Sequence, residues 1–505
     1  MKRQPVITGL GIVSPIGVGV EKFWAAALAG KIGHSHSHHV RLIKASSRVS
    51  NRRGGTGIRS ASMDACANHA GHQSFRPVRN SHSQDVQLRM KNSRRRVVIT
   101  GLGVVAPNGI GKEAFWANLV AGKSAVDYVN AFDASSYASK VAAEVKEFRA
   151  SDFISSRKVR MMARFSQFAV VATQLALEDA RLSITPALSG DVTICYGTSV
   201  AGLELAVAGV YDFTQRGVGV IKPSTALDYP PHAASSYLSI EFGIKGPALS
   251  VSSNCCTGID AIQVASSLIA TSRAKIALAG ACDTPIFPPI FDSFCMLGAL
   301  TKRDDAPQKA SRPYDQLRDG LVLAEGGATL ILEDLEFALA RGAHIYAEVL
   351  GYGAASEAAG MRATDQSGQV MAHAICAAIK SADLRPGDID YINAHGSSLP
   401  DFDIVDSNAF KHALGAHAYR VPITSIKSMI GQPVSAAGVL QAAAACLSIQ
   451  HQLVPPTINQ EFPDPQCDLD YVPNMSRVAR VRHVLINGHS FGGSVTALVL
   501  GRLET

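Results

Sequence analysis

The stretch SVSSNCCTGIDAIQVASSLIA, residues 250–270, has the pattern of a buried strand, a sharp turn and a helix. The turn places Cys255 at the N-terminal end of that helix. Free N–H groups and the helix macrodipole stabilise a thiolate there, so we expect a lowered pKa and a nucleophilic cysteine. Gly258 allows a neighbouring backbone or a substrate to approach the helix closely. The competing interpretation is an inert cysteine, because buried cysteines are common in protein cores.

Three further segments place reactive groups at the ends of predicted strands. YINAHGSSLPDFDIVD (391–406) carries His395, a candidate acid/base or oxyanion donor, with a hydrogen-bonded loop histidine as the alternative. SIKSMIGQPVSAAG (425–438) carries Lys427 ahead of an Ala-rich helix, where a buried ammonium would need a partner. INGHSFGGSV (486–495) is a glycine-rich turn whose backbone N–H groups could bind an oxyanion. Each segment alone is a weak signal, but together the four loops indicate a catalytic site.

Strands alternate with helices from residue 97 onward, which predicts an α/β protein. One set of strands is RVVITGLGVV, DVTICYGTS, ALSVSSN, KIALAGACD and GATLILED. A second set is HIYAEVLGYG, DIDYINAHG, VPITSIKS, RHVLINGHS and TALVLGRL. Helices such as 161–182 and 368–384 lie between the strands. Two successive sets of similar size predict two packed halves, each with a mixed sheet covered by helices.

Charge is distributed unevenly along the 505 residues. Residues 1–96 hold 17 Lys and Arg against three acidic residues, a net charge of +14, so residues 97–505 carry −7. The acidic remainder argues against nucleic-acid binding. Nine cysteines, an odd number without metal-ligand spacing, indicate a reducing compartment and a cytoplasmic protein without a metal site. The most apolar run, Ser435–Ile449, is too short for a membrane span and is better interpreted as a buried helix.

The N-terminal part contains a duplication. VITGLGIVSPIGVGVEKFWAAALAGK (6–31) recurs as VITGLGVVAPNGIGKEAFWANLVAGK (98–123). We interpret residues 1–32 as a duplicated fragment and the basic, low-complexity residues 33–94 as a disordered linker. The first 89 residues then represent a remnant of a related neighbouring gene or a mis-assigned start. A transit peptide is the alternative, because the stretch is rich in Arg and Ser and poor in acids.

The four loops together resemble those of the β-ketoacyl-acyl carrier protein synthases of the thiolase superfamily, over essentially all of 95–505. RPYDQLRDGLVLAEGG (312–327), ARGAHIYAEVLGYGA (340–354) and LVPPTINQEFPDPQCDLDYVPN (453–474) are similar to connecting segments of that family. The resemblance implies a five-layer αβαβα fold of two similar halves, 95–340 and 341–505, that is dimeric through the first half.

The resemblance also implies the reaction and the role of each site residue. Cys255 takes an acyl group from a carrier-protein thioester, malonyl-carrier protein loses carbon dioxide, and the resulting enolate attacks the acyl-enzyme. The backbone N–H groups of Cys255 and Phe491 form an oxyanion hole, and Phe491 also gates the malonyl side. His395 assists decarboxylation. The remaining implied roles are a Lys427–Asp406 pair that stiffens the site, Asp403 fixing the loop after His395, and Val200 and Phe294 in the acyl pocket.

Several positions depart from the pattern of the family. Gln432 stands where the family has its second catalytic histidine, and an amide can donate a hydrogen bond but cannot be protonated. Ser397 and Leu399 replace two threonines that contact the pantetheine arm, and only the serine keeps a hydroxyl. The remaining changes are His489–Ser490 in place of Phe-Gly before the gate and Asp406 in place of a longer Glu. These changes cluster on the malonyl and pantetheine side, so we expect acyl loading to survive and decarboxylation to be affected.

Three functions fit these observations. The first is an active decarboxylating ketosynthase of fatty-acid or polyketide synthesis, with a Cys-His-Gln site. The second is a partner subunit like the chain-length factors, although such partners typically lose the nucleophile that Cys255 retains. The third is an acyltransferase or thioesterase that loads Cys255 without extending the chain, and a chain without activity is the last alternative. We expect acyl carrier protein as partner, a homodimer or a heterodimer with a second ketosynthase subunit, no nucleic acid or membrane, and no cofactor beyond the phosphopantetheine that carries the substrates.

Overall fold

A computed structural model describes residues 13–14, 17–18 and 95–504 of the chain. The chain divides into two units, Met1–Arg79 and Asn80–Thr505. In the first unit, β1 (Val13–Ser14) pairs with β2 (Gly17–Val18) in antiparallel fashion. The rest of the predicted fragment 1–32 and the predicted linker 33–94 lie outside the described residues.

The first half of the second unit contains a five-stranded mixed sheet. Its strands, in spatial order, are β3 (Val97–Ala106), β10 (Gly326–Asp334), β9 (Ile276–Asp283), β7 (Val192–Gly197) and β8 (Ala248–Val251). β10 is antiparallel to both of its neighbours, β3 and β9, whereas β9, β7 and β8 are parallel. Apart from the edge strand β8, these strands are buried throughout, which explains their continuous apolar sequences.

The second half repeats this arrangement strand for strand. Its order is β11 (Ala347–Ser356), β17 (Ser494–Gly501), β16 (His483–His489), β12 (Tyr391–Asn393) and β13 (Ile423–Thr424). Again the first three strands are antiparallel and the last three parallel. A two-residue pairing of β3 with β11 joins the halves, and with β4 (Gly109–Ile110) the described residues form an 11-stranded sheet. All ten predicted strands are present.

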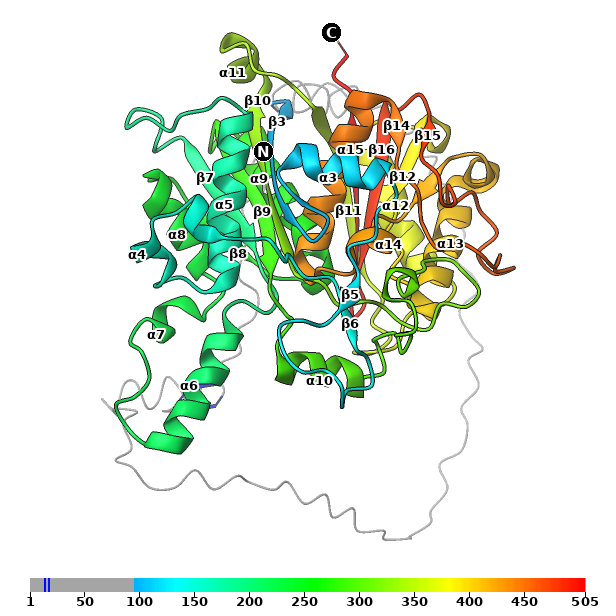
Figure 1. The fold of residues 1–505 in the computed structure, drawn as a ribbon. Helices are drawn as coiled ribbons and strands as arrows, with labels where there is room; N and C mark the ends of the chain where they lie inside the picture. The colour runs from blue at the N-terminus through cyan, green and yellow to red at the C-terminus, as the bar shows by residue number, and fades with distance from the viewer. Residues whose placement is uncertain (1–12, 15–16, 19–94, 505) are drawn as a thin grey trace, which may run out of the picture. The chain divides into compact units, whose positions relative to one another are not determined.

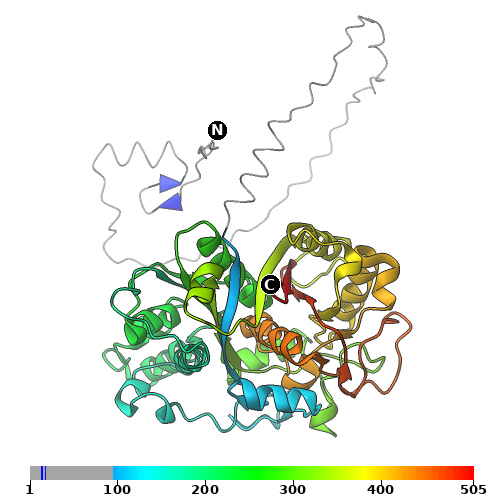
Figure 2. The ribbon, with the colours of Figure 1, turned by 90° about the horizontal axis from the view of Figure 1, so that it is seen from above.

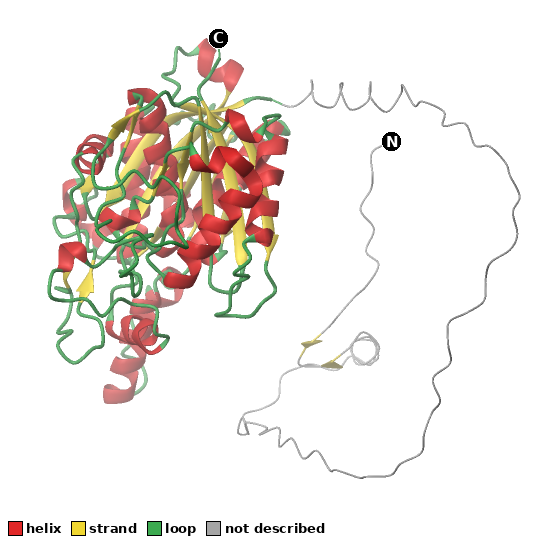
Figure 3. Cartoon of the chain, turned by 90° about the vertical axis from the view of Figure 1, so that its right-hand side faces the viewer, coloured by secondary structure: helices red, strands yellow, loops and turns green. Residues whose placement is uncertain are grey.

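Helices cover both faces of the two half-sheets and also fill the space between them. α5 (Arg164–Asp179) and α8 (Ala233–Phe242) pack on the outer face of the first half, and α12 (Gln369–Ser381) and α13 (Pro400–Leu414) cover the second (Figures 1 and 2). α9 (Thr257–Ala270) and α15 (Ala437–His451) lie between the half-sheets and contact strands of both. Helix, sheet, helix, sheet and helix give the five layers that the resemblance implies, which follow one another from left to right in Figure 2; Figure 3 shows the helices and strands from the right-hand side of Figure 1.

Shorter elements complete the described fold. The remaining helices are α3 (Lys112–Val120), α4 (Ser156–Val159), α6 (Leu203–Arg216), α7 (Thr225–Asp228), α10 (Pro288–Met296), α11 (Leu335–Ala340) and α14 (Lys427–Ile430). β5 (Asp127–Tyr128) pairs with β6 (Val141–Ala142), and β14 (Leu453–Val454) pairs with β15 (Arg477–Val478). By length and composition, one stretch of the described residues, Val434–His451, could cross a membrane, but 89% of it is buried inside the fold. It contains α15, so the prediction of a buried helix is confirmed.

The two central helices meet at a glycine. A Cβ atom at Gly258 of α9 would lie 2.5 Å from the Val439 nitrogen and 3.0 Å from the Ser435 carbonyl oxygen. Both neighbours are backbone atoms near the start of α15, so they cannot move aside as a side chain could. The close approach predicted for Gly258 is therefore confirmed, and it holds the N-terminal ends of the two helices together beneath the loops that carry the site.

Replacing Gly258 by alanine should lower the melting temperature by about 3–10 °C, because the added methyl group overpacks the contact between the helices. This sign is opposite to that of helix propensity, which favours alanine over glycine by about 1 kcal/mol. Gly190→Ala is the matched control, since a Cβ there meets no atom within 4 Å. Thermal unfolding followed by circular dichroism measures both changes, and equal melting temperatures for the two variants would contradict the prediction.

Candidate active site

Cys255 lies at the point where β8 leads into α9. A single 3-10 turn, Asn254–Cys256, connects the two elements and holds the Cys255 side chain against the start of α15. Only 6% of Cys255 is exposed. The Gln432 amide Nε2 lies 3.5 Å from the Cys255 sulfur and donates to it. The structure therefore brings the predicted nucleophile and the unusual glutamine into direct contact.

Burial controls the acidity of this cysteine. The pKa of Cys255 is raised to about 12, mainly by desolvation and also by the neighbouring Cys256, against the opposing positive charge of Lys427. A helix macrodipole contributes at most about 2 kcal/mol, which does not offset burial of this extent. The lowered pKa that we expected from the helix terminus is thus wrong for the unliganded site. Cys255 rests as a neutral thiol.

His395 is a neutral hydrogen-bond donor. It is 1% exposed, and burial, with the charges of Lys427 and His489, holds its pKa well below the usual range. The backbone N–H of His489 donates to its Nδ1 at 3.3 Å, so the ring proton is on Nε2. Among the described residues Nε2 has no hydrogen-bond partner, although it is buried. This arrangement suits donation to a substrate oxygen, as predicted for His395, and excludes a protonated imidazolium.

Lys427 supports His395 through the backbone. Its Nζ donates to the His395 carbonyl oxygen at 2.6 Å and to Gln441 Oε1 at 3.2 Å. Burial lowers the pKa of Lys427 to about 8, although Asp406 and Cys255 act in the opposite direction. These two contacts fix the position of the loop that carries His395.

The predicted Lys427–Asp406 ion pair is wrong. Within the described part of the chain no salt bridge joins the two side chains, since Lys427 Nζ contacts the His395 carbonyl and Gln441 instead. The Asp406 carboxylate instead accepts from the Gly396 N–H at 2.8 Å, the Tyr314 hydroxyl at 3.0 Å and the Asn487 amide at 2.7 Å. These three donors occupy the carboxylate, and the shorter side chain of aspartate keeps it close to them. Asp406 therefore acts on Lys427 only through its charge.

Asp403 holds the loop that follows His395. Its Oδ1 accepts from the N–H groups of Ser397 at 2.9 Å and Ser398 at 3.2 Å, and its Oδ2 accepts from the Tyr314 N–H at 2.9 Å. The Arg318 guanidinium lies 3.6 Å away. Burial nevertheless raises the pKa of Asp403 to about 7, with Arg318 opposing the shift. These contacts match the role predicted for Asp403.

An apolar cluster surrounds the Cys255 side chain. Its partly buried members include Phe294, Leu399 and Phe491, with the rings of Phe294 and Phe491 6.4 Å apart. Leu399 thus joins an apolar wall, while the predicted contact residue Ser397 is buried beside it. Val200 is not brought into this cluster: it follows β7, and its N–H donates to Asp283 at 2.8 Å. The structure thus places Phe294, but not Val200, against the apolar cluster that contains Cys255, and the acyl-pocket role of both residues stays a prediction.

Two polar residues that the sequence analysis missed connect the site. Gln441 of α15 donates from its Nε2 to the carbonyl oxygens of Asn393, Ala394 and Asn487. Asn487 of β16 accepts from the His395 N–H at 2.9 Å. Gln441 could have been found from the sequence, because it is an isolated polar residue in the apolar run AGVLQAAAACLSI.

Matches to known families cover most of the chain. The family described as "Beta-ketoacyl synthase, N-terminal domain" matches residues 94–338, and "Beta-ketoacyl synthase, C-terminal domain" matches residues 346–461. The chain belongs to the β-ketoacyl synthase family. This confirms the resemblance drawn from the four loops and the thiolase-like fold, and it makes the chain an acyltransferase by family.

Relatives include a polyketide synthase subunit and a 3-oxoacyl-[acyl-carrier-protein] synthase. The tetracenomycin polyketide synthase ketoacyl synthase alpha subunit of Streptomyces glaucescens is 41% identical over 82% of this chain and 98% of its own length. The 3-oxoacyl-[acyl-carrier-protein] synthase 2 of a Synechocystis strain is 38% identical over 81% of this chain and 99% of its own length.

Two solved structures share the fold at similar identity. A ketosynthase in complex with its type II polyketide synthase acyl-carrier protein, bound to a hexaketide, gives a TM-score of 0.76 at 36% identity. The ishigamide ketosynthase/chain length factor gives a TM-score of 0.76 at 33% identity. Each covers 81% of this chain and 100% of the solved chain.

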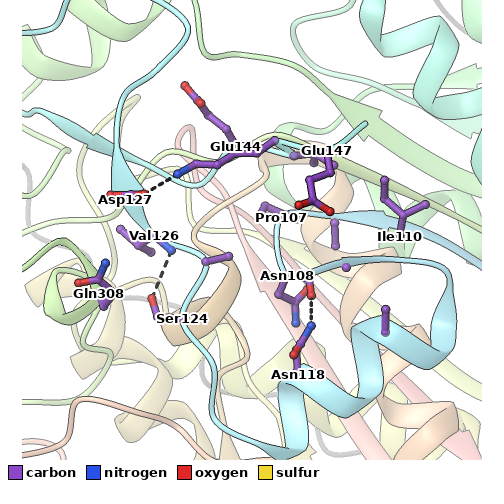
Figure 4. A pocket seen from close by; sticks show the side chains of 16 residues that line it. Pro107, Asn108, Ile110, Asn118, Ser124, Val126, Asp127, Glu144, Glu147 and Gln308 are labelled. Carbon is purple, nitrogen blue, oxygen red and sulfur yellow. Dashed lines mark hydrogen bonds and ion pairs between the residues drawn. The ribbon is translucent and has the colours of Figure 1, made fainter. Parts of the chain in front are cut away.

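A separate pocket lies away from the cysteine. It has a volume of about 560 Å³ and is lined by residues around β4, α3 and β6, including Asn108, Asp127 and Glu144 (Figure 4). None of the predicted site residues lines it. The Asp127 carboxylate there is paired with Lys146, and Glu144 accepts two backbone N–H groups. The volume of this pocket therefore does not indicate where the catalytic residues lie.

Alkylation of Cys255 by iodoacetamide in the unliganded protein should rise with pH without a plateau below about pH 10, because the thiolate is the reacting form. The sign follows from the pKa of about 12, since each unit of pH below it reduces the thiolate tenfold. Mass spectrometry of the Cys255 peptide measures the rate, and the exposed Cys376 serves as an internal reference for reagent delivery. A plateau near neutral pH would show that the helix terminus controls the thiol after all.

Proposed function

We propose that this chain is a decarboxylating β-ketoacyl synthase in which Cys255, His395 and Gln432 perform the reaction. The observation that carries the proposal is a pair of neutral N–H donors, one of them on the Cys255 sulfur and the other buried without a partner. Gln432 Nε2 contacts the Cys255 sulfur, and His395 presents a protonated Nε2 without a partner among the described residues. Two such donors are what a thioester oxygen requires when it becomes negatively charged.

The first stage of the proposed reaction is acyl transfer. The Cys255 sulfur attacks the carbonyl carbon of an acyl thioester, the new carbon–sulfur bond forms as the bond to the pantetheine sulfur breaks, and the pantetheine leaves as a thiol with the proton of Cys255. The backbone N–H groups of Cys255 and Phe491 would receive the oxyanion. Gln432 acts here too, because an amide donor stabilises the developing thiolate. We expected the residues that depart from the family pattern to leave acyl loading intact. For Gln432 this expectation does not hold, because its amide also takes part in acyl transfer.

The second stage is decarboxylation and condensation. The malonyl thioester oxygen would accept hydrogen bonds from His395 and Gln432 while the bond to carbon dioxide breaks and its electrons form an enolate. The enolate carbon then attacks the acyl carbon on Cys255, and the carbon–sulfur bond breaks to release the Cys255 thiolate, which takes up a proton from solvent and returns to the neutral thiol. Since both donors are neutral, the stage needs no protonated histidine. We keep the prediction that no metal or cofactor takes part beyond the phosphopantetheine of the carrier.

The proposed partners are an acyl carrier protein and a second ketosynthase subunit. The edge strand β8 is exposed, with Leu249 at 41%, and Ile240 of the neighbouring α8 is 75% exposed. An unpaired, apolar sheet edge favours pairing with another chain. The ketosynthase bound to its carrier protein and the ketosynthase/chain length factor among the structural neighbours support both partners. We place the reaction in the cytoplasm, in line with eight free cysteines in the described residues.

The two half-reactions can be separated in one experiment. The full chain is incubated with an acyl-carrier protein, and intact mass spectrometry follows the adduct on Cys255, with Cys255→Ala as the control. Malonyl-carrier protein is then added, and carbon dioxide and elongated product are measured. We expect both the adduct and elongation. A stable adduct without either product would favour the non-elongating acyltransferase, and activity only after mixing with a second ketosynthase would favour the partner subunit.

Replacing Gln432 by leucine, which has a similar size but no donor, should reduce condensation about 10²–10³-fold. Gln432→His restores an N–H donor and should keep the rate within about tenfold of that of the unchanged chain. Initial rates of carbon dioxide release and of Cys255 acylation are measured for both variants. Equal rates for Gln432→Leu and the unchanged chain would remove Gln432 from the proposed mechanism.

A further inference from the structure

The loop that carries Phe491, Ser490–Gly493, is held by side chains that the family's usual Phe-Gly before the gate could not supply. Ser490 Oγ donates to the Ser253 carbonyl oxygen at 2.9 Å and accepts from the Cys256 N–H at 3.1 Å. The same oxygen lies 3.2 Å from the Cys256 sulfur. A glycine at this position would make none of these contacts. Ser490 therefore joins the Phe491 loop directly to the turn that presents Cys255.

His489 joins the other side of the loop to the end of β11. Its Nε2 lies 3.2 Å from Glu357 Oε2, and both side chains are 0% exposed. The two atoms lie close without hydrogen-bond geometry: among the described residues, none of the ring nitrogens of His489 and the carboxylate oxygens of Glu357 has a hydrogen-bond partner. The His489 ring also stacks on Phe402 of α13 at 4.1 Å. A buried carboxylate requires a counter-charge or a donor, so Glu357 and His489 depend on each other.

The backbone of the same segment completes the attachment. The Glu357 N–H donates to the Gly493 carbonyl oxygen at 2.8 Å, and the Gly492 N–H donates to the Met361 carbonyl oxygen at 2.9 Å. Gly492 and Gly493 have φ values of +89° and +79°, a conformation that favours glycine. The Phe491 ring is thereby placed 5.4 Å from Phe402, centroid to centroid. Movement of Phe491 must disturb contacts on both sides of its loop.

We propose that Ser490 and the His489–Glu357 pair form a two-sided latch that keeps Phe491 closed over Cys255. The latch residues are positioning residues: they act on Phe491 and touch no reacting atom. A closed loop excludes water from the acyl-enzyme and makes loop opening a separate step before the second thioester enters. This inference rests on the proposed function only for the identity of that thioester, because Phe491 packs against the apolar cluster that contains Cys255, which is 6% exposed.

The test measures access to Cys255 without any substrate, so its outcome is independent of whether the chain condenses. A bulky maleimide is reacted with the full chain and with Ser490→Gly, His489→Phe/Glu357→Gln and the combined variant. The paired change removes both partners, so no buried charge is left alone. We expect alkylation of Cys255 to rise about fivefold for Ser490→Gly, since a hydrogen bond is worth about 1 kcal/mol, to rise also for the paired change, and to rise furthest in the combined variant.

Two controls distinguish the latch from general loosening of the fold. Cys195 and Cys282 are 0% exposed in the same half, so their alkylation reports unfolding, and fragmentation of the labelled peptide separates Cys255 from Cys256. His451→Phe replaces another histidine, whose ring stacks on Trp116, and so controls for the exchange of a histidine for a phenylalanine. Unchanged alkylation of Cys255 in all three variants would overturn the proposal, as would an equal rise at Cys195 and Cys282. In an active chain, the variants should also hydrolyse the acyl-enzyme faster, whereas a purely structural role would leave that rate unchanged.

Discussion

The buried ammonium of Lys427 is the interaction on which the geometry of the site depends. It donates to the His395 carbonyl and to Gln441, and Gln441 in turn donates to three carbonyl groups at the ends of β12 and β16. In a low-dielectric interior such a network is strong when all its members are paired and costly when one is lost. The position of His395 is therefore set through its backbone, by a cation that does not approach the substrate.

The contact of Gln432 with the sulfur changes how this glutamine is understood. A histidine at this place could act through either of two protonation states, whereas an amide offers one neutral donor at every pH. With His395 also neutral, the two donors contribute fixed dipoles rather than mobile protons. Catalysis of this type depends on how rigidly the donors are held, which makes the surrounding network as important as the donors themselves.

Much of the fold could be predicted from the sequence, because the strands are continuous apolar runs ended by glycine and charged residues. The nucleophile, the histidine and the lysine could be found for the same reason: each stands at a strand end in a glycine-containing loop. The lowered pKa of Cys255 and the Lys427–Asp406 pair could not be predicted correctly. Both depend on burial and on competing donors such as Tyr314 and Asn487, which come from segments distant in the sequence. The place of Val200 likewise depends on its bond to Asp283.

The repeated strand order has an electrostatic consequence for the site. Cys255 precedes α9 in the first half, and Gln432 precedes α15 at the corresponding place in the second half, after the third strand of each set. The contact at Gly258 brings the N-terminal ends of these helices together. Each end carries the equivalent of about half a positive charge from its unpaired N–H groups. The internal symmetry of the fold thus directs two partial positive charges at one point, where an acyl oxygen would become negative.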